Sequence, residues 1–236
     1  MLTVSTRLQS SSAAPPTPEA LLDALLRSPR LELYARQTQG VLAAEQAARE
    51  QFYESVQEGD KAEFVNGEVI VHSPVKLEHN SVGNKLLKLI DTYVEKHDLG
   101  VVGYEQLMVS LTRNDYEPDL CFFGKAKAAA FTHDQMRFPA PDFVVEIVSE
   151  STVGTDRGVK FDDYAAHGVR EYWIVDPVQE VIEHYVLSGD AYTLELKVHD
   201  GTLRSVANPG FEMPVRAAFD GAENARALRA MVVGGE

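Results

Sequence analysis

The stretches Glu117-Pro-Asp-Leu-Cys-Phe-Phe123 and Asp142-Phe-Val-Val-Glu-Ile-Val148 decide the fold of this chain. Each is a short apolar run next to turn-forming residues, a pattern typical of buried strands. Asp119 interrupts the first run and Glu146 interrupts the second. An unpaired carboxylate is expensive to bury, so both acids need a partner, and a metal ion is one such partner. The two runs therefore indicate a functional site within a sheet.

Helix and strand patterns extend from these runs in both directions. A hairpin is predicted over residues 62–71, because Asn66-Gly67 is a tight-turn pair between two apolar runs. One-sided apolar spacing predicts a helix over 80–96, and a second helix is predicted over 156–167, closed by Gly168. Further strands are expected at 101–104, 106–111, 118–123, 143–148, 171–176, 181–187 and 192–198. This order predicts a mixed α/β (α+β) fold around one central sheet flanked by helices.

The remaining segments give the domain organisation. Residues 1–16 are rich in Ser, Ala, Thr and Pro and are expected to be a disordered lead-in. Residues 17–58 are expected to form an N-terminal helical extension, with a first helix capped at Thr17, stopped by Pro29, and followed by a second helix over about 42–56. The main domain is expected over 59–215, followed by a C-terminal tail over 216–236.

Composition points to a protein of the cytoplasm. The chain has 236 residues, 44% of them apolar, and contains no apolar run long enough to span a membrane. Its N-terminus lacks the continuous apolar segment of a secretory signal. The single cysteine, Cys121, has no internal partner for a disulfide and lies in an apolar run, so it is interpreted as a buried small hydrophobe. We therefore expect a cytoplasmic protein without a membrane partner.

The formal net charge of −14 excludes one class of function. A protein that coats nucleic acid is normally basic, because Lys and Arg neutralise the phosphates. Here 22 basic residues face 36 acidic ones. Any action on nucleic acid must therefore rest on a local basic patch, on bound metal ions or on another subunit.

The acid pair itself suits a divalent ion. Side chains alternate along a strand, so two acids on neighbouring strands can project from one face of a sheet. Carboxylate oxygens suit Mg²⁺ or Mn²⁺, and the backbone carbonyl of Ile147 would offer a further ligand. Such an ion polarises a phosphoryl oxygen and activates a water. A nearby lysine would orient that water and balance developing charge.

Several ordered motifs carry a resemblance to a known family. They are Glu63 before the Asn66-Gly67 turn, His79 near a helix start, Pro118-Asp119, Val145 to Ser149, Ser151-Thr152, Asp156-Arg157, Lys160, Tyr164, Gly168-Val169 and Glu171 to Pro177. Over residues 52–215 this series resembles the Uma-two family of restriction endonucleases in the PD-(D/E)xK nuclease superfamily. The N-terminal fifty residues lie outside the resemblance.

The resemblance implies a restriction-endonuclease-like core and a Mg²⁺-dependent endonuclease that hydrolyses DNA. It implies Asp119, Glu146, Lys160 and Glu63 as catalytic residues, with Asp119, Glu146 and Ile147 at the metal. The superfamily's usual lysine, two residues after the glutamate, is replaced here by Val148. Lys160, on the following helix, is the candidate replacement.

Each assignment has a structural alternative. Glu63 either orients a water or Lys160, or forms a cross-strand ion pair. His79 is either a packed residue or a group that contacts the site, and Lys160 is either catalytic or an ordinary exposed lysine. Asp156 is either an N-cap or an orienting acid, and Arg157 either binds phosphate or pairs with an acid on the sheet.

Competing functions also remain open. A nuclease-fold protein without cleavage activity would serve as a binding or assembly module, and the acidic charge favours it. A two-carboxylate glycosidase would need no metal and would give Lys160 no role. If the substrate is duplex DNA, a homodimer is expected, because a two-fold axis places one site on each strand.

Overall fold

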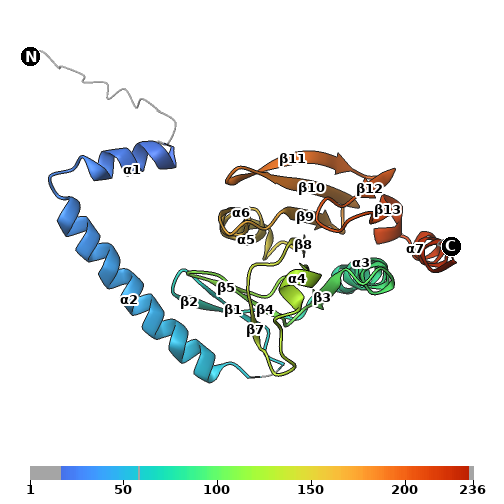
Figure 1. Cartoon of the computed structure of the whole chain (residues 1–236), viewed down its shortest axis with the longest axis horizontal. Coiled ribbons are helices and arrows are strands. Elements are labelled where there is room, and N and C mark those ends of the chain that lie inside the picture. Colours follow the sequence, from blue (N-terminus) through green and yellow to red (C-terminus); the bar gives the residue numbers. More distant parts are fainter. Residues whose placement is uncertain (1–16, 58, 234–236) are drawn as a thin grey trace, which may run out of the picture. The chain divides into compact units, whose positions relative to one another are not determined.

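The computed structural model describes residues 17–57 and 59–233, so the predicted lead-in over 1–16 lies outside the described residues (Figure 1). The chain divides into two compact units, Met1–Ala47 and Ala48–Glu236. The first unit holds the helix α1 (Pro18–Leu26) and most of α2 (Leu31–Ser55). The hydroxyl of Thr17 accepts a hydrogen bond from the Ala20 amide, as an N-cap does.

Helix α2 is longer than its sequence pattern predicts. The predicted helix began near residue 42, whereas α2 begins at Leu31, shortly after Pro29. The polar first half of this helix has little one-sided apolar spacing, so only propensity supports it. Of the side chains described between residues 17 and 47, none is buried.

The second unit contains the remaining elements. Its strands are β1 (Ala62–Val65), β2 (Glu68–Val71), β3 (Gly100–Tyr104), β4 (Met108–Ser110), β5 (Asp115–Tyr116), β6 (Leu120–Gly124), β7 (Arg137–Phe138), β8 (Phe143–Ile147), β9 (Glu171–Asp176), β10 (Val181–Ser188), β11 (Ala191–Val198), β12 (Thr202–Arg204) and β13 (Glu212–Pro214). Its helices are α3 (Leu77–Lys96), α4 (Lys125–Ala128), α5 (Val153–Asp156), α6 (Val159–Ala166), the short 3₁₀ helix η1 (Val215–Ala218) and α7 (Gly221–Val233). Across the described residues, 17–57 and 59–233, no helix is long and apolar enough to cross a membrane.

The strands form two large mixed sheets and not the single sheet that was predicted. The first has the order β2-β1-β5-β4-β7, the second has the order β11-β10-β9-β8-β6-β3, and β12 pairs with β13 separately. The predicted hairpin pairs with β5 and so builds its own sheet. Only β4–β7 and β8–β9 are parallel pairs. The predicted mixed α/β fold with flanking helices is confirmed.

The second sheet is covered on both faces. On one face, Leu86 and Ile90 of α3 pack with Phe122 and Val145 of the sheet, in a core that also includes Trp173. The other face packs against α6 and the first sheet, in a core that includes Cys121, Val144, Tyr164, Tyr172 and Val65. Helix α6 therefore lies between the two sheets, as Figure 1 shows. Side chains of adjacent strand residues point to opposite faces, which assigns each residue of β6 and β8 to one core or the other.

The predicted helix over 156–167 is broken into α5 and α6 at Arg157–Gly158. A Cβ on Gly158 would lie 2.7 Å from the carbonyl oxygen of Gly154, a distance at which the backbone would have to move. Glycine permits this close turn, which the apolar spacing of the segment does not reveal. As a result Asp156 ends one helix while Lys160 begins the next.

The predicted tail is part of the fold. Helix α7 contacts α3, and the side-chain amide of Asn224 donates hydrogen bonds to the carbonyls of Lys85 and Ala217. Asn224 is buried, so these bonds satisfy a polar group that would otherwise lose its water.

Arg49 joins the C-terminal part of α2 to the first sheet. Its guanidinium contacts both oxygens of Asp115, at 2.6 and 2.8 Å, and donates to the carbonyls of Leu111, Thr112 and Asn114. Asp115 is fully buried, and the Tyr53 hydroxyl donates to it as well. A paired and fully hydrogen-bonded charge of this kind is stable only while both partners remain.

We expect Arg49→Met to lower the free energy of unfolding by about 3–5 kcal/mol, because it leaves Asp115 charged and unpaired in the core. Urea denaturation followed by circular dichroism measures the loss. The matched control is Arg36→Met, which removes an exposed ion pair to Glu32 in the same helix and should cost less than about 1 kcal/mol. Equal losses in the two variants would contradict this account of α2.

Candidate active site

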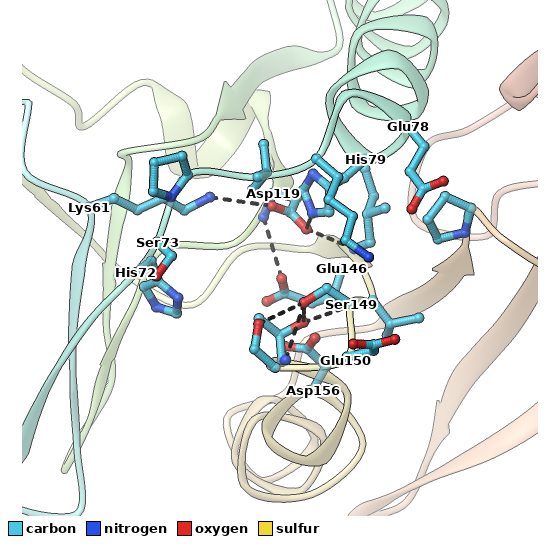
Figure 2. Close-up of a pocket in the computed structure, with 18 of the residues that line it drawn as sticks. Lys61, His72, Ser73, Glu78, His79, Asp119, Glu146, Ser149, Glu150 and Asp156 are labelled. Atoms are coloured by element: carbon cyan, nitrogen blue, oxygen red, sulfur yellow. Dashed lines mark hydrogen bonds and ion pairs between the residues drawn. The ribbon is translucent and has the colours of Figure 1, made fainter.

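Asp119 and Glu146 lie at the end of the ladder between β6 and β8. In this antiparallel pair Leu120 is opposite Val145, so the preceding Asp119 lies beside the following Glu146. Both belong to the face of the sheet that is directed toward α6, and Figure 2 shows the two carboxylates within one group of side chains. The Asp119 amide is 3.5 Å from Glu146 Oε2, and the Ile147 amide donates to Asp119 Oδ2 at 2.8 Å.

Asp119 has two basic neighbours. His79 Nε2 lies 3.2 Å from its Oδ2, and Lys61 Nζ lies 3.5 Å from its Oδ1. Burial alone would raise the pKa of Asp119, but His79, Lys61 and the Ile147 amide lower it below its usual range. Burial likewise opposes the charged form of His79, yet Asp119 raises the pKa of this imidazole. Asp119 is therefore held as a carboxylate.

Lys160 lies among three buried carboxylates. Its Nζ is 2.8 Å from Glu63 Oε1, 3.1 Å from Glu146 Oε1 and 3.5 Å from Asp156 Oδ1. Burial alone would lower the pKa of Lys160, but Glu146, Glu63 and Asp156 raise it well above its usual value. The ammonium is therefore permanently protonated, and its three N–H donors match the three acids. Lys160 is buried, unlike an ordinary helical lysine.

Glu63 supports Lys160 from the first sheet. It shares a face of β1 with Val65, the face directed toward α6, and accepts a hydrogen bond from the Glu117 amide at 2.9 Å. Its second oxygen lies 3.1 Å from His72 Nε2. Burial opposes ionisation of Glu63, but Lys160 and His72 lower its pKa to about 2. Glu63 therefore makes both of the contacts that were considered. It pairs with His72 across the hairpin, and it forms an ion pair with Lys160.

These groups line a cavity of about 270 Å³. Its floor is formed by Asp119, Glu146, Asp156 and Lys160. Its walls come from the segment before α3, from the turn after β8 and from the turn after β9. With single residues from other elements, the remaining lining residues are Lys61, His72, Ser73, Pro74, Val75, Lys76, Glu78, His79, Glu117, Ile147, Val148, Ser149, Glu150, Ser151, Thr152, Pro177 and Val178.

The cavity carries excess negative charge. Burial raises the pKa of Glu146 well above its usual value, and although Lys160 opposes this, Asp156, Asp119 and Glu63 raise it further. Burial also raises the pKa of Asp156, against the effect of Lys160. Four carboxylates thus share one fully buried ammonium, together with the less buried Lys61. A divalent cation would relieve this repulsion.

The donor set fits a magnesium-type ion and not a caged metal. Within residues 17–57 and 59–233, no group of three or more His, Cys, Asp or Glu side chains is arranged to hold a metal ion. Magnesium is usually held by one or two carboxylates, with waters and substrate phosphate oxygens as its other ligands. Asp119 and Glu146 supply two carboxylates beside an open cavity, which meets that requirement.

One predicted site residue lies apart from the rest. Arg157 Nη1 is 2.5 Å from Glu183 on β10, and it does not line the cavity. Of the two alternatives for Arg157, the structure therefore agrees with pairing to an acid on the sheet. Asp156 is the last residue of α5, and Gly158 is the N-cap of α6, so the N-cap interpretation of Asp156 is wrong. Its carboxylate lies 3.5 Å from Lys160 Nζ.

Sequence reasoning missed three residues of this site: Lys61, His72 and Glu117. Burial and the neighbouring Glu63 raise the pKa of Glu117 to about 7, and its side chain lines the cavity. Strand periodicity was the available signal, because Glu117 precedes Asp119 by two residues and Lys61 precedes Glu63 by two. His72 is adjacent because its amide donates to the Lys61 carbonyl across the hairpin.

Replacing Lys160 by Met should destabilise the fold by about 3–5 kcal/mol at pH 7.5, because three buried carboxylates lose their cation. With Lys160 present, Glu63 contributes stability above its ordinary pKa of 4.5, and this contribution is lost as the pH falls toward 2. Without Lys160, burial raises the pKa of Glu63 instead, and protonation becomes favourable. The destabilisation should therefore shrink between pH 7.5 and pH 4.

Urea denaturation at several pH values measures this change. The control is Lys197→Met, which removes a largely exposed lysine paired with Glu183 and should cost less than about 1 kcal/mol. A Lys160→Met penalty that is constant from pH 7.5 to pH 4 would contradict the assigned charges.

Known proteins resemble this chain in sequence and in fold. An uncharacterized protein of Synechocystis is 28% identical over 156 residues, which covers 65% of this chain and 84% of the relative. The crystal structure of a "putative nuclease belonging to DUF820" from Anabaena variabilis superposes with a TM-score of 0.63 at 15% identity, over 72% of this chain and 96% of that one. At that identity the likeness concerns the fold.

The family comparison covers most of the chain. Residues 49–216 match Uma2, described as "Putative restriction endonuclease". The match includes both sheets and every residue placed around the cavity, and it begins at Arg49. The resemblance drawn from the sequence motifs is thereby confirmed. This chain belongs to the Uma2 family.

Proposed function

We propose that this protein is a divalent-metal-dependent endonuclease that hydrolyses phosphodiester bonds of DNA. One observation carries the proposal: Asp119 and Glu146 lie side by side at the floor of a cavity whose carboxylates outnumber its buried cations. Membership of a family described as restriction endonucleases supports a nucleic acid as the substrate.

Asp119 and Glu146 would hold Mg²⁺, with Mn²⁺ as a substitute and the Ile147 carbonyl as a further ligand. When bound, the ion would polarise a phosphoryl oxygen and make a water more acidic. The chain's own residues fix the acids for this task. His79 and the Ile147 amide orient Asp119, while the Lys160 ammonium lies 3.1 Å from Glu146 Oε1.

Lys160 acts as a cation and not as a base, because its neighbours keep it protonated. Positive charge next to Glu146 stabilises negative charge that develops on a phosphate during attack. Glu63 and Asp156 position the ammonium through ion pairs at 2.8 and 3.5 Å. In this role Lys160 replaces the lysine that Val148 displaces from the strand.

A catalytically silent binding or assembly module is the second candidate. Lys160 favours it, because three carboxylates already surround the ammonium within 3.5 Å and compete with a water for its N–H groups. The two candidates differ in one respect: the nuclease must hydrolyse DNA with a metal, whereas the module binds without turnover. A homodimer, in which two sites address the two strands of a duplex, remains a prediction for the nuclease if its substrate is duplex DNA.

The test is hydrolysis of plasmid and oligonucleotide DNA in Mg²⁺, in Mn²⁺ and in EDTA. Asp119→Asn and Glu146→Gln should each lower the rate by about a hundredfold or more, because each removes a carboxylate that would hold the ion, and the ion would stabilise the transition state. Glu195→Gln, an exposed acid on β11, is the matched control and should retain the rate. Cleavage that persists in EDTA or in the Asp119→Asn protein would refute the metal site.

Calorimetric titration with Mn²⁺ separates the two candidates further. If the protein is the nuclease, the wild type should bind Mn²⁺ and the Asp119→Asn variant should not. The wild type should also melt at a higher temperature when the ion is present. Metal binding without hydrolysis of any nucleic acid would favour the silent module.

A further inference from the structure

The candidate catalytic acids are recessed. The side chains of Asp119 and Glu146 are 9% and 3% exposed, and they are reached through a cavity of about 270 Å³. A phosphate on an intact duplex is held on the outside of a stiff, stacked helix. Deforming such a helix over a binding site costs on the order of 1–6 kcal/mol, which contacts to the protein must offset. A recessed site therefore favours a backbone that bends freely.

The mouth of the cavity is apolar on two sides. Val75, in the segment before α3, is 40% exposed, and Val178, in the turn after β9, is 73% exposed. Leu77 at the start of α3 is 83% exposed, between the lining residues Lys76 and Glu78. Exposed apolar side chains are suited to contact the faces of bases that have lost their stacking partners.

The charges at the mouth do not suit a duplex. Glu78 and Glu150 are exposed lining residues, and Figure 2 shows both to one side of Asp119 and Glu146. Lys76 is the exposed cation of the lining, since Lys61 and Lys160 are paired with carboxylates. Proteins that hold a duplex neutralise several phosphates at once with Lys and Arg. The exposed cation at this mouth can neutralise about one phosphate.

From the recessed acids, the apolar mouth and the sparse cations, we propose that the site takes a strand with unpaired bases, either a single strand or a frayed or gapped end, and not an intact duplex. The inference rests on the proposed function and specifies the form of its nucleic acid. An unpaired strand can turn one phosphodiester toward Asp119 and Glu146 while its neighbouring bases contact the lining residues Val75 and Val178. Apolar contact then supplies affinity that phosphate neutralisation cannot supply to so acidic a protein.

The first experiment measures binding of a fluorescent oligonucleotide as a single strand, as the matching duplex and as a duplex with an unpaired central loop. Fluorescence anisotropy is recorded with the wild-type protein in Ca²⁺ and at several salt concentrations. The single strand and the looped duplex should bind about tenfold or more tightly than the intact duplex. The logarithm of the affinity should fall with the logarithm of salt with a slope near −0.7 to −1.4, about one or two phosphates.

The second experiment tests the mouth itself. The double variant Val75→Ser, Val178→Ser should lose about fivefold or more of its affinity for the single strand, with an unchanged melting temperature, because both side chains are exposed and replacing them leaves the core intact. The matched control is Leu194→Ser, Leu196→Ser, two exposed positions on β11 that do not line the cavity. It should bind as the wild type does.

Equal affinity for single strand and duplex, or equal losses in the mouth variant and the control, would overturn the inference. Hydrolysis of the same three oligonucleotides in Mg²⁺ or Mn²⁺ distinguishes a failure of this inference from a failure of the proposed nuclease function. Preferential single-strand binding without hydrolysis would leave the inference in place and overturn the nuclease. Hydrolysis of the intact duplex at the rate of the single strand would support the nuclease and overturn the preference for unpaired strands. If the protein binds none of the oligonucleotides, both proposals are overturned.

Discussion

The ion cluster around Lys160 is the constraint on which the rest of the structure depends. One ammonium joins Glu63 of the first sheet, Glu146 of the second sheet and Asp156 at the end of α5. Each of these groups is buried, so each would be costly alone. The break at Gly158 serves the same cluster, because it separates the helix that carries Asp156 from the helix that carries Lys160. The spacing of sheets and helices is therefore adjusted to a charged cluster as well as to the apolar cores on the two faces of the second sheet.

The family match sets this centre in context. It begins at Arg49, whose bonds to the first sheet fix the end of α2, and it ends at residue 216 within η1. Helix α7 lies beyond the match but packs against α3. The first unit, Met1–Ala47, lies before the match.

Much of the fold could be predicted from the sequence, because local patterns determine it. Alternation along β6 and β8 indicated that Asp119 and Glu146 share a face, and Asn66-Gly67 located the hairpin. The pairing of strands that are distant in the sequence could not be predicted from local patterns. Periodicity does not say which strand a hairpin will join, so the division into two sheets was missed, and with it the approach of Lys61 and Glu117 to the acids. The break at Gly158 was missed because it depends on a steric contact with Gly154, which no apolar pattern reports.

The wide separation of Glu63 and Lys160 along the chain has a consequence for how the protein folds. Neither group can leave water before the other arrives, and β1 can reach α6 only after the intervening strands have begun to pair. Contacts between distant parts of a chain form slowly because a long loop must be closed first. The charged centre should therefore be absent from the folding transition state and assemble on its native side. Interactions that form after the transition state mainly set the rate of unfolding, so the cluster would slow unfolding and give the native protein kinetic stability.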